Sequence, residues 1–211
     1  MDLQLFYMPY SCATATYIVL TEAGAPFRVH AVNMSKGEHL KPEYLRLNPK
    51  HQVPLLLIDG EPLSENVAIQ LWVARQFPAA RLLPDGGLDE FRAISWLAWF
   101  ASGLHPALTP NILPQRYCDM PGTEEGVRRA AHRLLLERLA VAEEHLRDRE
   151  WFCAAFTLAD AYFYWCFRRA TQFKVDVSAL PACRALFERV GARPSTRQLL
   201  EFEAATLAAW K

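Results

Sequence analysis

The sequence predicts a chain of two parts, an α/β part followed by an all-helical part. Short apolar runs at residues 3–7, 27–32 and 55–58 are typical of strands, and helical periodicity lies between them. The rest of the chain holds amphipathic helical patterns and no further strand pattern. Residues 78–87 separate the two parts, because they are rich in Pro, Gly and Asp and show no periodicity.

The first part begins with a βαβ unit. A strand over residues 3–7 is followed by a helix from about residue 13 to 23, which Gly24 ends, and by a second strand over 27–32. The next segment, residues 33–47, contains Gly and Pro and is expected to hold one irregular helix.

A hairpin and a helix complete the first part. Pro54 cannot donate a ladder hydrogen bond and should therefore precede the strand over residues 55–58. Asp59-Gly60 suits a two-residue hairpin turn, and residues 62–63 form a short return strand. A helix then begins near Ser64-Glu65-Asn66. The resulting order, βαβ then ββα, is a thioredoxin-like arrangement, which we assign to residues 1–78.

Helices fill the second part, which we assign to residues 88–211. Thr157 and Asp160 fit a capping box, in which the side chain of each residue accepts the backbone N–H of the other. This motif predicts the start of a buried central helix. The stretch 94–101 is apolar nearly all round, which is typical of a buried or interface helix. Helices are expected at about 89–117, from 122–124 onward, and at 161–167, 181–190 and 196–208.

Composition restricts the classes of function. The chain has 211 residues, 52% of them hydrophobic, and its 23 basic residues balance its 23 acidic residues. This balance argues against a nucleic-acid or anionic-membrane partner. Five scattered cysteines without a CxxC pair argue against disulfides and structural metal. We see no signal peptide and no membrane span, and we expect a cytoplasmic protein.

The hairpin region offers two features that could hold an extended peptide. Gln52-Val53 can present free backbone N–H and C=O groups to a strand-like ligand. The turn into the helix at Glu65-Asn66 presents backbone N–H groups and a positive dipole end, which favour a carboxylate. The alternative is an ordinary hairpin that leads into a helix and carries no function.

Two further residues are candidates for chemistry. Cys12 follows the first strand at the start of a helix, where the helix N-terminus is expected to lower the thiol pKa. An inert core cysteine is the alternative. His105 precedes Pro106 and could hydrogen-bond a thiol or stabilise a thiolate. The alternative is a histidine whose hydrogen bonds are satisfied at a helix bend.

Four motifs in order along the chain carry a resemblance to a known family. They are Tyr-Met-Pro-Tyr-Ser-Cys at 7–12, Asn-Pro-Lys-His-Gln-Val-Pro at 48–54, Leu-Ser-Glu-Asn-Val-Ala-Ile at 63–69 and Phe-Thr-Leu-Ala-Asp-Ala-Tyr at 156–162. The chain resembles the cytosolic glutathione S-transferases over nearly its full length, and most of all the bacterial beta class. The family has a thioredoxin-like domain followed by a helical one.

The resemblance implies a role for each candidate near the glutathione sulfur. Cys12 would contact the sulfur and could form a mixed disulfide with it. Ser11 and Tyr7 are hydroxyl alternatives, since sister classes use Ser or Tyr to stabilise the bound thiolate. His105 would face the thiol site.

It also implies how the rest of glutathione is held. Val53 would supply two backbone hydrogen bonds to the cysteinyl unit, with Gln52 before it and a cis Pro54 after it. The γ-glutamyl end would meet the residues at the helix start, and the glycine carboxylate would meet a lysine of the 33–47 loop. These residues are Glu65, Asn66 and Lys36.

The sequence departs from the family pattern at several positions. Ala98 and Gly103 stand where the pattern carries Asn and Glu near the γ-glutamyl group, and His51 replaces a usual Gly. A weakened or absent glutathione site would leave a non-catalytic binding or regulatory protein of the same fold.

Three functions therefore remain open at this point. The first is conjugation of the glutathione thiol to a small hydrophobic electrophile by a homodimer. The helical part, with Trp99 and Tyr117, and Tyr10 of the first part would line the electrophile pocket. The second is glutathione-dependent thiol–disulfide exchange through Cys12. The third is the non-catalytic module.

Overall fold

A computed structural model describes all residues from 1 to 211 and divides the chain into two compact units. The first unit comprises Met1–Asp85 together with Gly191–Lys211, and the second comprises Gly86–Val190. This is the predicted class, an α/β unit and an all-helical unit. The first unit extends to Asp85 and also includes residues 191–211, whereas the prediction assigned residues 1–78 to the first part and 88–211 to the second.

The first unit is built on a four-stranded mixed sheet in the order β2-β1-β3-β4. β1 (Leu3–Tyr7) lies parallel to β2 (Phe27–Ala31), and β3 (Leu55–Ile58) runs antiparallel to both β1 and β4 (Glu61–Ser64). The register places Leu5 opposite Val29 on one side and Leu56 on the other. The predicted second strand ends one residue earlier than expected, at Ala31.

The hairpin turn between β3 and β4 follows from its sequence. Asp59 has φ 50° and Gly60 has φ 92°, so both central residues adopt the left-handed conformation of a two-residue turn. Asp-Gly is a preferred pair for that conformation, because Gly carries no Cβ penalty there. The turn confirms the predicted hairpin and fixes which residues of β3 face which residues of β4.

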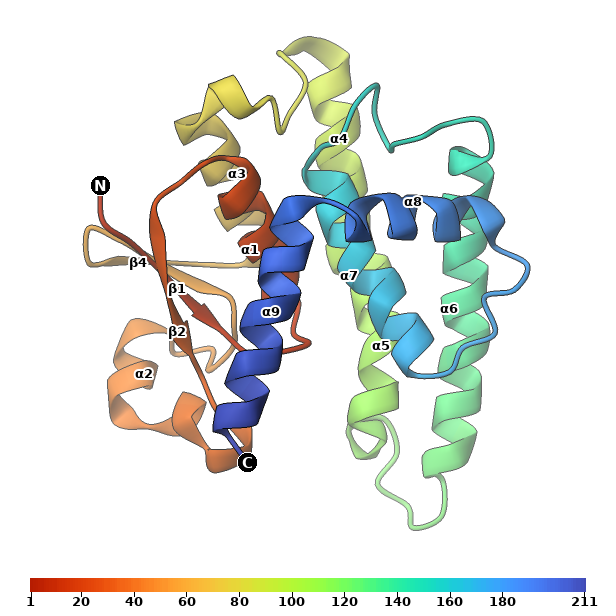
Figure 1. Cartoon of the computed structure of the whole chain (residues 1–211). Helices are drawn as coiled ribbons and strands as arrows, with labels where there is room; N and C mark the ends of the chain where they lie inside the picture. The colour runs from red at the N-terminus through yellow and green to blue at the C-terminus, as the bar shows by residue number, and fades with distance from the viewer. The chain divides into compact units, whose positions relative to one another are not determined.

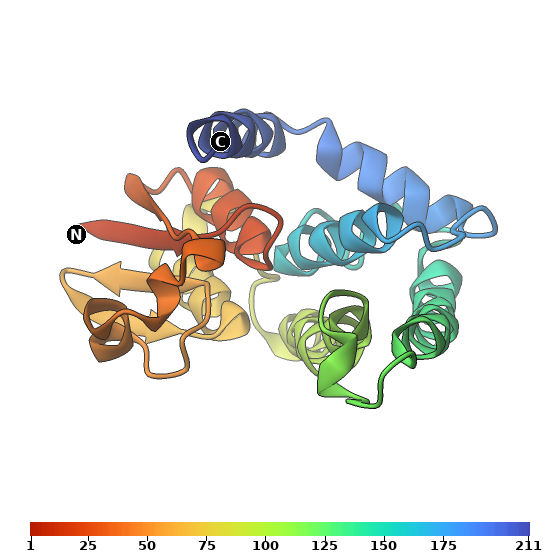
Figure 2. The ribbon, with the colours of Figure 1, turned by 90° about the horizontal axis from the view of Figure 1, so that it is seen from below.

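Four α-helices accompany the sheet. α1 (Ala13–Glu22), α2 (Pro42–Leu47) and α3 (Asn66–Gln76) follow the strands, and α9 (Pro194–Ala209) returns from the end of the chain. α1 lies beside α9 in both views and packs against α3 as well (Figures 1 and 2). Every residue of α1 from 13 to 20 is buried, which makes this helix the centre of the unit.

The second unit contains five α-helices. α4 (Gly87–Trp99), α5 (His105–Ile112), α6 (Glu124–Leu146) and α7 (Leu158–Gln172) run roughly alongside one another, and α8 (Pro181–Gly191) crosses them (Figure 1). All residues of α7 from 158 to 167 are buried, as predicted. The predicted capping box is present, and the Asp160 carboxylate accepts the N–H groups of Thr157 at 2.7 Å and Phe152 at 2.9 Å.

The long helix predicted over residues 89–117 is wrong in its length and continuity. A π-helical turn, Phe100–Leu104, separates α4 from α5, and α5 ends at Ile112. Leu113 leaves the helical region with φ −130° and ψ 62°, because the following Pro114 disfavours a helical residue before it. The stretch 94–101 is also less buried than predicted, since Ser95 and Ala98 are exposed.

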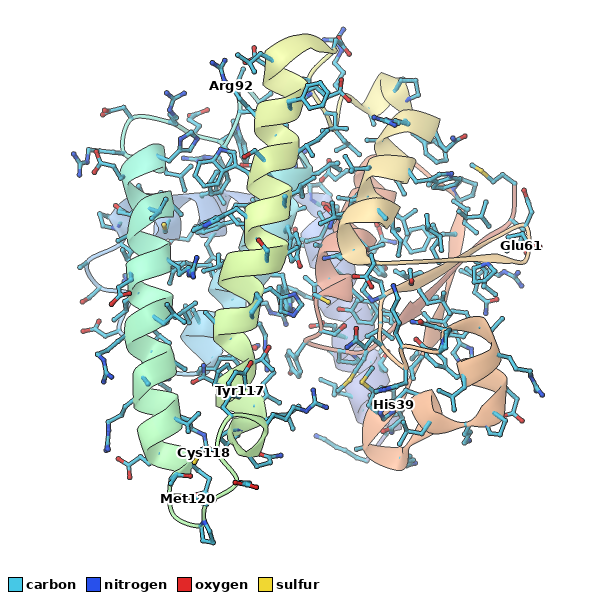
Figure 3. All side chains as sticks on the ribbon, turned by 180° about the vertical axis from the view of Figure 1, so that it is seen from behind. His39, Glu61, Arg92, Tyr117, Cys118 and Met120 are labelled. Carbon is cyan, nitrogen blue, oxygen red and sulfur yellow. The ribbon has the colours of Figure 1, made fainter.

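The loop between α5 and α6 carries exposed apolar side chains. Tyr117 and Met120 are labelled there in Figure 3, with exposed fractions of 54% and 63%. None of the helices has both the length and the apolar character that crossing a lipid bilayer requires. All five cysteines are free, and no set of three or more His, Cys, Asp or Glu side chains is grouped to hold a metal ion.

Candidate functional site

The candidate site of the first unit is centred on Cys12, which caps the start of α1. Cys12 is half-buried, and its Sγ donates to the carbonyl oxygen of Val53 across 3.6 Å. Ser11 shapes the turn before it, because its Oγ donates to the Met8 carbonyl at 2.7 Å and accepts from Ala13 N–H at 3.3 Å. The fold therefore brings Cys12 and Val53, 41 residues apart, into contact.

The ionisation of Cys12 differs from the expectation. Burial, with a smaller contribution from the negative charge of Glu65, raises the pKa of the Cys12 thiol to about 12. The N–H groups of Cys12 and Ala13 act in the opposite direction but are outweighed. The predicted net lowering of this pKa is wrong, because the desolvation of the thiolate outweighs the N–H groups at the helix start. At neutral pH the group is a thiol and can donate a hydrogen bond.

Val53 and Pro54 form the edge beside that thiol. The peptide bond between them is cis. The Val53 side chain packs in a buried cluster with Phe6, Tyr44 and Leu55, and this packing fixes the backbone that the site uses. The carbonyl of the preceding Gln52 accepts from Tyr44 Oη at 2.5 Å and from Asn48 Nδ2 at 2.8 Å.

The start of α3 provides the second edge of the site. Glu65 adopts φ 76°, a left-handed value that is uncommon for a residue other than glycine, and its carboxylate meets Lys50 Nζ at 2.6 Å. Asn66, the first residue of α3, is buried. Its Nδ2 donates to the Cys12 carbonyl at 3.2 Å, and its Oδ1 accepts from Thr16 Oγ1 at 2.5 Å. Asn66 thus ties the N-terminus of α3 to the N-terminus of α1.

The remaining predicted residues are exposed or belong to the other unit. Lys36 and the Gln52 side chain are exposed to solvent. His105 begins α5 in the second unit, where its Nδ1 lies 2.9 Å from Tyr162 Oη and its ring packs edge-on against Trp165. Its predicted place opposite the thiol remains a prediction.

Sequence reasoning missed one residue that contacts the segment before Cys12. Glu203 of α9 is 2% exposed, accepts a hydrogen bond from Tyr7 Oη and accepts another from Tyr10 N–H at 2.9 Å. Tyr7, considered above as an alternative thiolate donor, is fully buried and uses its hydroxyl in contacts with Glu203 and with Thr14 at 3.2 Å. The signal in the sequence was a glutamate four residues after Leu199, on the buried side of the last helix.

Comparison with known proteins places this geometry in a family. Residues 1–75 match the family model "Glutathione S-transferase, N-terminal domain", and residues 102–194 match "Glutathione S-transferase, C-terminal domain". The chain is 34% identical over 205 residues to glutathione S-transferase GstA of Escherichia coli O157:H7, which covers 95% of this chain and 98% of the relative. The chain belongs to the glutathione S-transferase family.

Solved structures of glutathione S-transferases agree with this assignment. A bacterial beta class enzyme from Sphingomonas chungbukensis superimposes with a TM-score of 0.85 at 33% identity, over 95% of this chain and 98% of the other. A sphingomonad glutathione S-transferase complexed with glutathione gives a TM-score of 0.84 at 32% identity, again over 95% and 98%. The first of these neighbours supports the expected likeness to the beta class.

Proposed function

We propose that this chain is a glutathione transferase that joins the glutathione thiol to a small hydrophobic electrophile. The observation that carries the proposal is the meeting of three groups in the first unit. The backbone at Val53 and cis Pro54, the N-terminus of α3 at Glu65-Asn66 and the thiol of Cys12 lie around one point, and Cys12 contacts both edges. Family membership and the glutathione-bound neighbour support the same ligand.

Each edge suits one part of glutathione. Extended peptides pair with free backbone groups, and Val53 would offer its N–H and C=O to the cysteinyl unit. The positive end of α3 would attract the γ-glutamyl carboxylate, and Glu65 would attract its ammonium group. Lys36 is exposed in the segment between β2 and α2 and would meet the glycine carboxylate.

The raised pKa of Cys12 defines its role in this proposal. A protonated thiol can donate a hydrogen bond to the sulfur of glutathione, and this bond would stabilise the glutathione thiolate that attacks the electrophile. The Cys12 thiol would have to give up its hydrogen bond to the Val53 carbonyl. That carbonyl would then be free to accept from the glutathione backbone. Ser11 is less suited to the same task, because its proton is donated to the Met8 carbonyl. His105 would assist from the second unit.

Thiol–disulfide exchange is the second candidate. In that reaction the Cys12 thiolate attacks one sulfur of glutathione disulfide, a mixed disulfide forms, and the other glutathione leaves as a thiolate. The half-buried Cys12 at the start of α1 favours this chemistry by position, whereas its raised pKa opposes it. A cytoplasmic homodimer is the assembly that the family suggests for either reaction.

One pair of assays tests both reactions on the same protein. The purified chain and its Cys12→Ala variant are supplied with reduced glutathione and 1-chloro-2,4-dinitrobenzene, and separately with glutathione and a mixed disulfide. We expect conjugation in the wild type and a reduced rate in the variant. Absence of conjugation from correctly folded wild-type protein would contradict the proposal. Loss of only the disulfide reaction in the variant would favour exchange as the role of Cys12.

A further inference from the structure

A pocket in the second unit has no role in the proposed glutathione site. It has a volume of about 420 Å³, which is within the range of small-molecule sites. It lies between α5 and α6, which pack against each other, and Tyr117 of the segment that connects them completes its lining (Figure 3). Every lining residue falls between 102 and 138, so the pocket belongs to the second unit alone. Apart from Tyr117, which was expected near the electrophile, none of these residues has been given a function in the sections above.

The lining of this pocket is apolar along most of its length. On α6, Val127, Ala131 and Leu134 recur every three to four residues and therefore lie on one face of the helix. α5 adds two prolines and an alanine. Arg138 continues the stripe of α6, four residues after Leu134, and is the only charged residue in the lining. The pocket thus has an apolar body and one positively charged end.

The guanidinium of Arg138 has no partner within the protein. Arg138 is partly buried and makes no hydrogen bond or ion pair, whereas the partly buried Arg193 is paired with the carboxylate of Glu22. The residues three and four positions away on α6, at 134, 135, 141 and 142, are all apolar. Its Nη1 lies 3.0 Å from the place that a Cβ of Gly103 would occupy, so the nearby π-helical turn offers no side chain there. An anion from outside the chain would compensate this charge.

We propose that the pocket between α5 and α6 binds a small molecule that carries one carboxylate on an apolar chain. The guanidinium of Arg138 would pair with the carboxylate, because its planar fork of donors matches the two oxygens of that group. The apolar chain would lie along the stripe from Leu134 to Val127, where it leaves water. Val127 precedes Arg138 by eleven residues, about 16 Å along the helix, which leaves room for a medium-chain fatty acid. This site does not depend on the proposed function.

Decanoate is a suitable probe, and 1-decanol is its neutral counterpart with the same chain. The binding of each to the wild-type protein is measured by isothermal titration calorimetry at pH 7.5, where decanoate is ionised. We expect saturable binding of decanoate and binding of decanol that is weaker by about tenfold or more, because decanol cannot pair with a guanidinium. Octanoate should bind about tenfold more weakly than decanoate, since it buries two fewer CH₂ groups.

The first variant tests the charged end of the pocket. Arg138→Gln should weaken the binding of decanoate by about tenfold or more and leave the binding of decanol unchanged. Arg133→Gln is the matched control, because Arg133 is exposed on the same helix and does not line the pocket. Its affinities for both ligands should stay within about threefold of the wild type. The comparison of the two ligands separates carboxylate binding from a general change in the shape of the pocket.

The second variant tests the apolar body. Leu134 lines the pocket and is 40% exposed, so Leu134→Ala should keep the fold, which circular dichroism checks. It should weaken the binding of decanoate and of decanol alike, by roughly threefold to tenfold, because both ligands lose the same apolar contact. Unchanged affinity for both ligands would place the chain of decanoate elsewhere and would contradict the proposal.

Absence of decanoate binding to the folded wild-type protein would overturn the proposal. Equal losses in Arg138→Gln and Arg133→Gln would also overturn it, because general charge attraction would then be responsible. So would loss of decanoate binding in saturating glutathione, which would place decanoate at the glutathione site. If a second copy of this chain covers the pocket instead, decanoate should not bind, and Arg138→Gln should change the sedimentation coefficient. Failure of glutathione conjugation would count against the proposed function and leave the decanoate result standing.

Discussion

The amide of Asn66 spans the gap between the first turns of α3 and α1. Its nitrogen donates to the Cys12 carbonyl at 3.2 Å, and its oxygen accepts from the Thr16 hydroxyl at 2.5 Å. One side chain therefore holds the two helix N-termini that would bind the γ-glutamyl end and the sulfur of glutathione. Asn66 therefore links these two ends directly.

Replacing Asn66 should lower the stability of the folded protein. Asn66→Ala leaves the buried Thr16 hydroxyl and the Cys12 carbonyl without this partner, and we expect a loss of about 1–3 kcal/mol in the free energy of unfolding. Urea denaturation measures this loss. The exposed Gln52→Ala is the control and should stay within about 0.5 kcal/mol of the wild type. A loss of stability in Asn66→Ala as small as that expected for Gln52→Ala would contradict the strength assigned to the Asn66 contacts.

The Cys12 thiol should titrate well above an ordinary cysteine. Burial raises its pKa to about 12, so the thiolate fraction in the unliganded protein stays small at pH 8 and keeps rising with each pH unit up to at least pH 10. The rate of Cys12 alkylation should therefore increase about tenfold per pH unit between pH 8 and 10. N-acetylcysteine amide, a blocked cysteine with a thiol pKa of about 8.5, should level off within this interval. A plateau for Cys12 below pH 9 would contradict the effect of burial.

The capping carboxylate of the second unit should make stability depend on pH. Burial raises the pKa of Asp160 from 3.8 to about 6, although three hydrogen bonds from residues 152 and 157 act to lower it. Because the folded protein then holds the proton to a higher pH than the unfolded chain, the contribution of Asp160 to stability is full below about pH 4. It falls as the pH rises through 6.

Urea denaturation of wild type and Asp160→Asn at several pH values tests this sign. The advantage of the wild type over the variant should shrink by roughly 1–3 kcal/mol between pH 4 and 7. The exposed Asp176→Asn, whose carboxyl has a pKa lowered by hydrogen bonds from Ser178, should give a difference that does not vary over this range. An advantage that grows with pH would show that the hydrogen bonds to Asp160 outweigh its burial.

Local signals were sufficient for much of the fold. The Asp59-Gly60 turn and the Thr157–Asp160 capping box depend on residues within three positions of each other, and both are present as predicted. The helix predicted over 89–117, in contrast, is wrong in its length. Its apolar pattern continues past Ile112, whereas Pro114 disfavours a helical conformation of Leu113, and α5 ends there.

Long-range features of the site could not be read from the chain. The contact of Glu203 with Tyr10 joins residues 193 positions apart, and no local pattern indicates such a pair. The pKa of Cys12 was predicted in the wrong direction, because the helix N-terminus is visible in the sequence and the burial of the thiol is not. The backbone at Gln52-Val53 could be proposed as a peptide-binding edge from local chemistry, but its assignment to glutathione depended on the resemblance of the motif to that of a family.

The most direct test of the account is a calorimetric titration of reduced glutathione into the wild-type protein, repeated with Cys12→Ala. We predict saturable binding of one glutathione per chain in the wild type. In Cys12→Ala we predict weaker binding by about tenfold, since the backbone and helix contacts remain and only the hydrogen bond to the sulfur is lost. Absence of binding in both proteins, each shown to be folded, would contradict the proposed site.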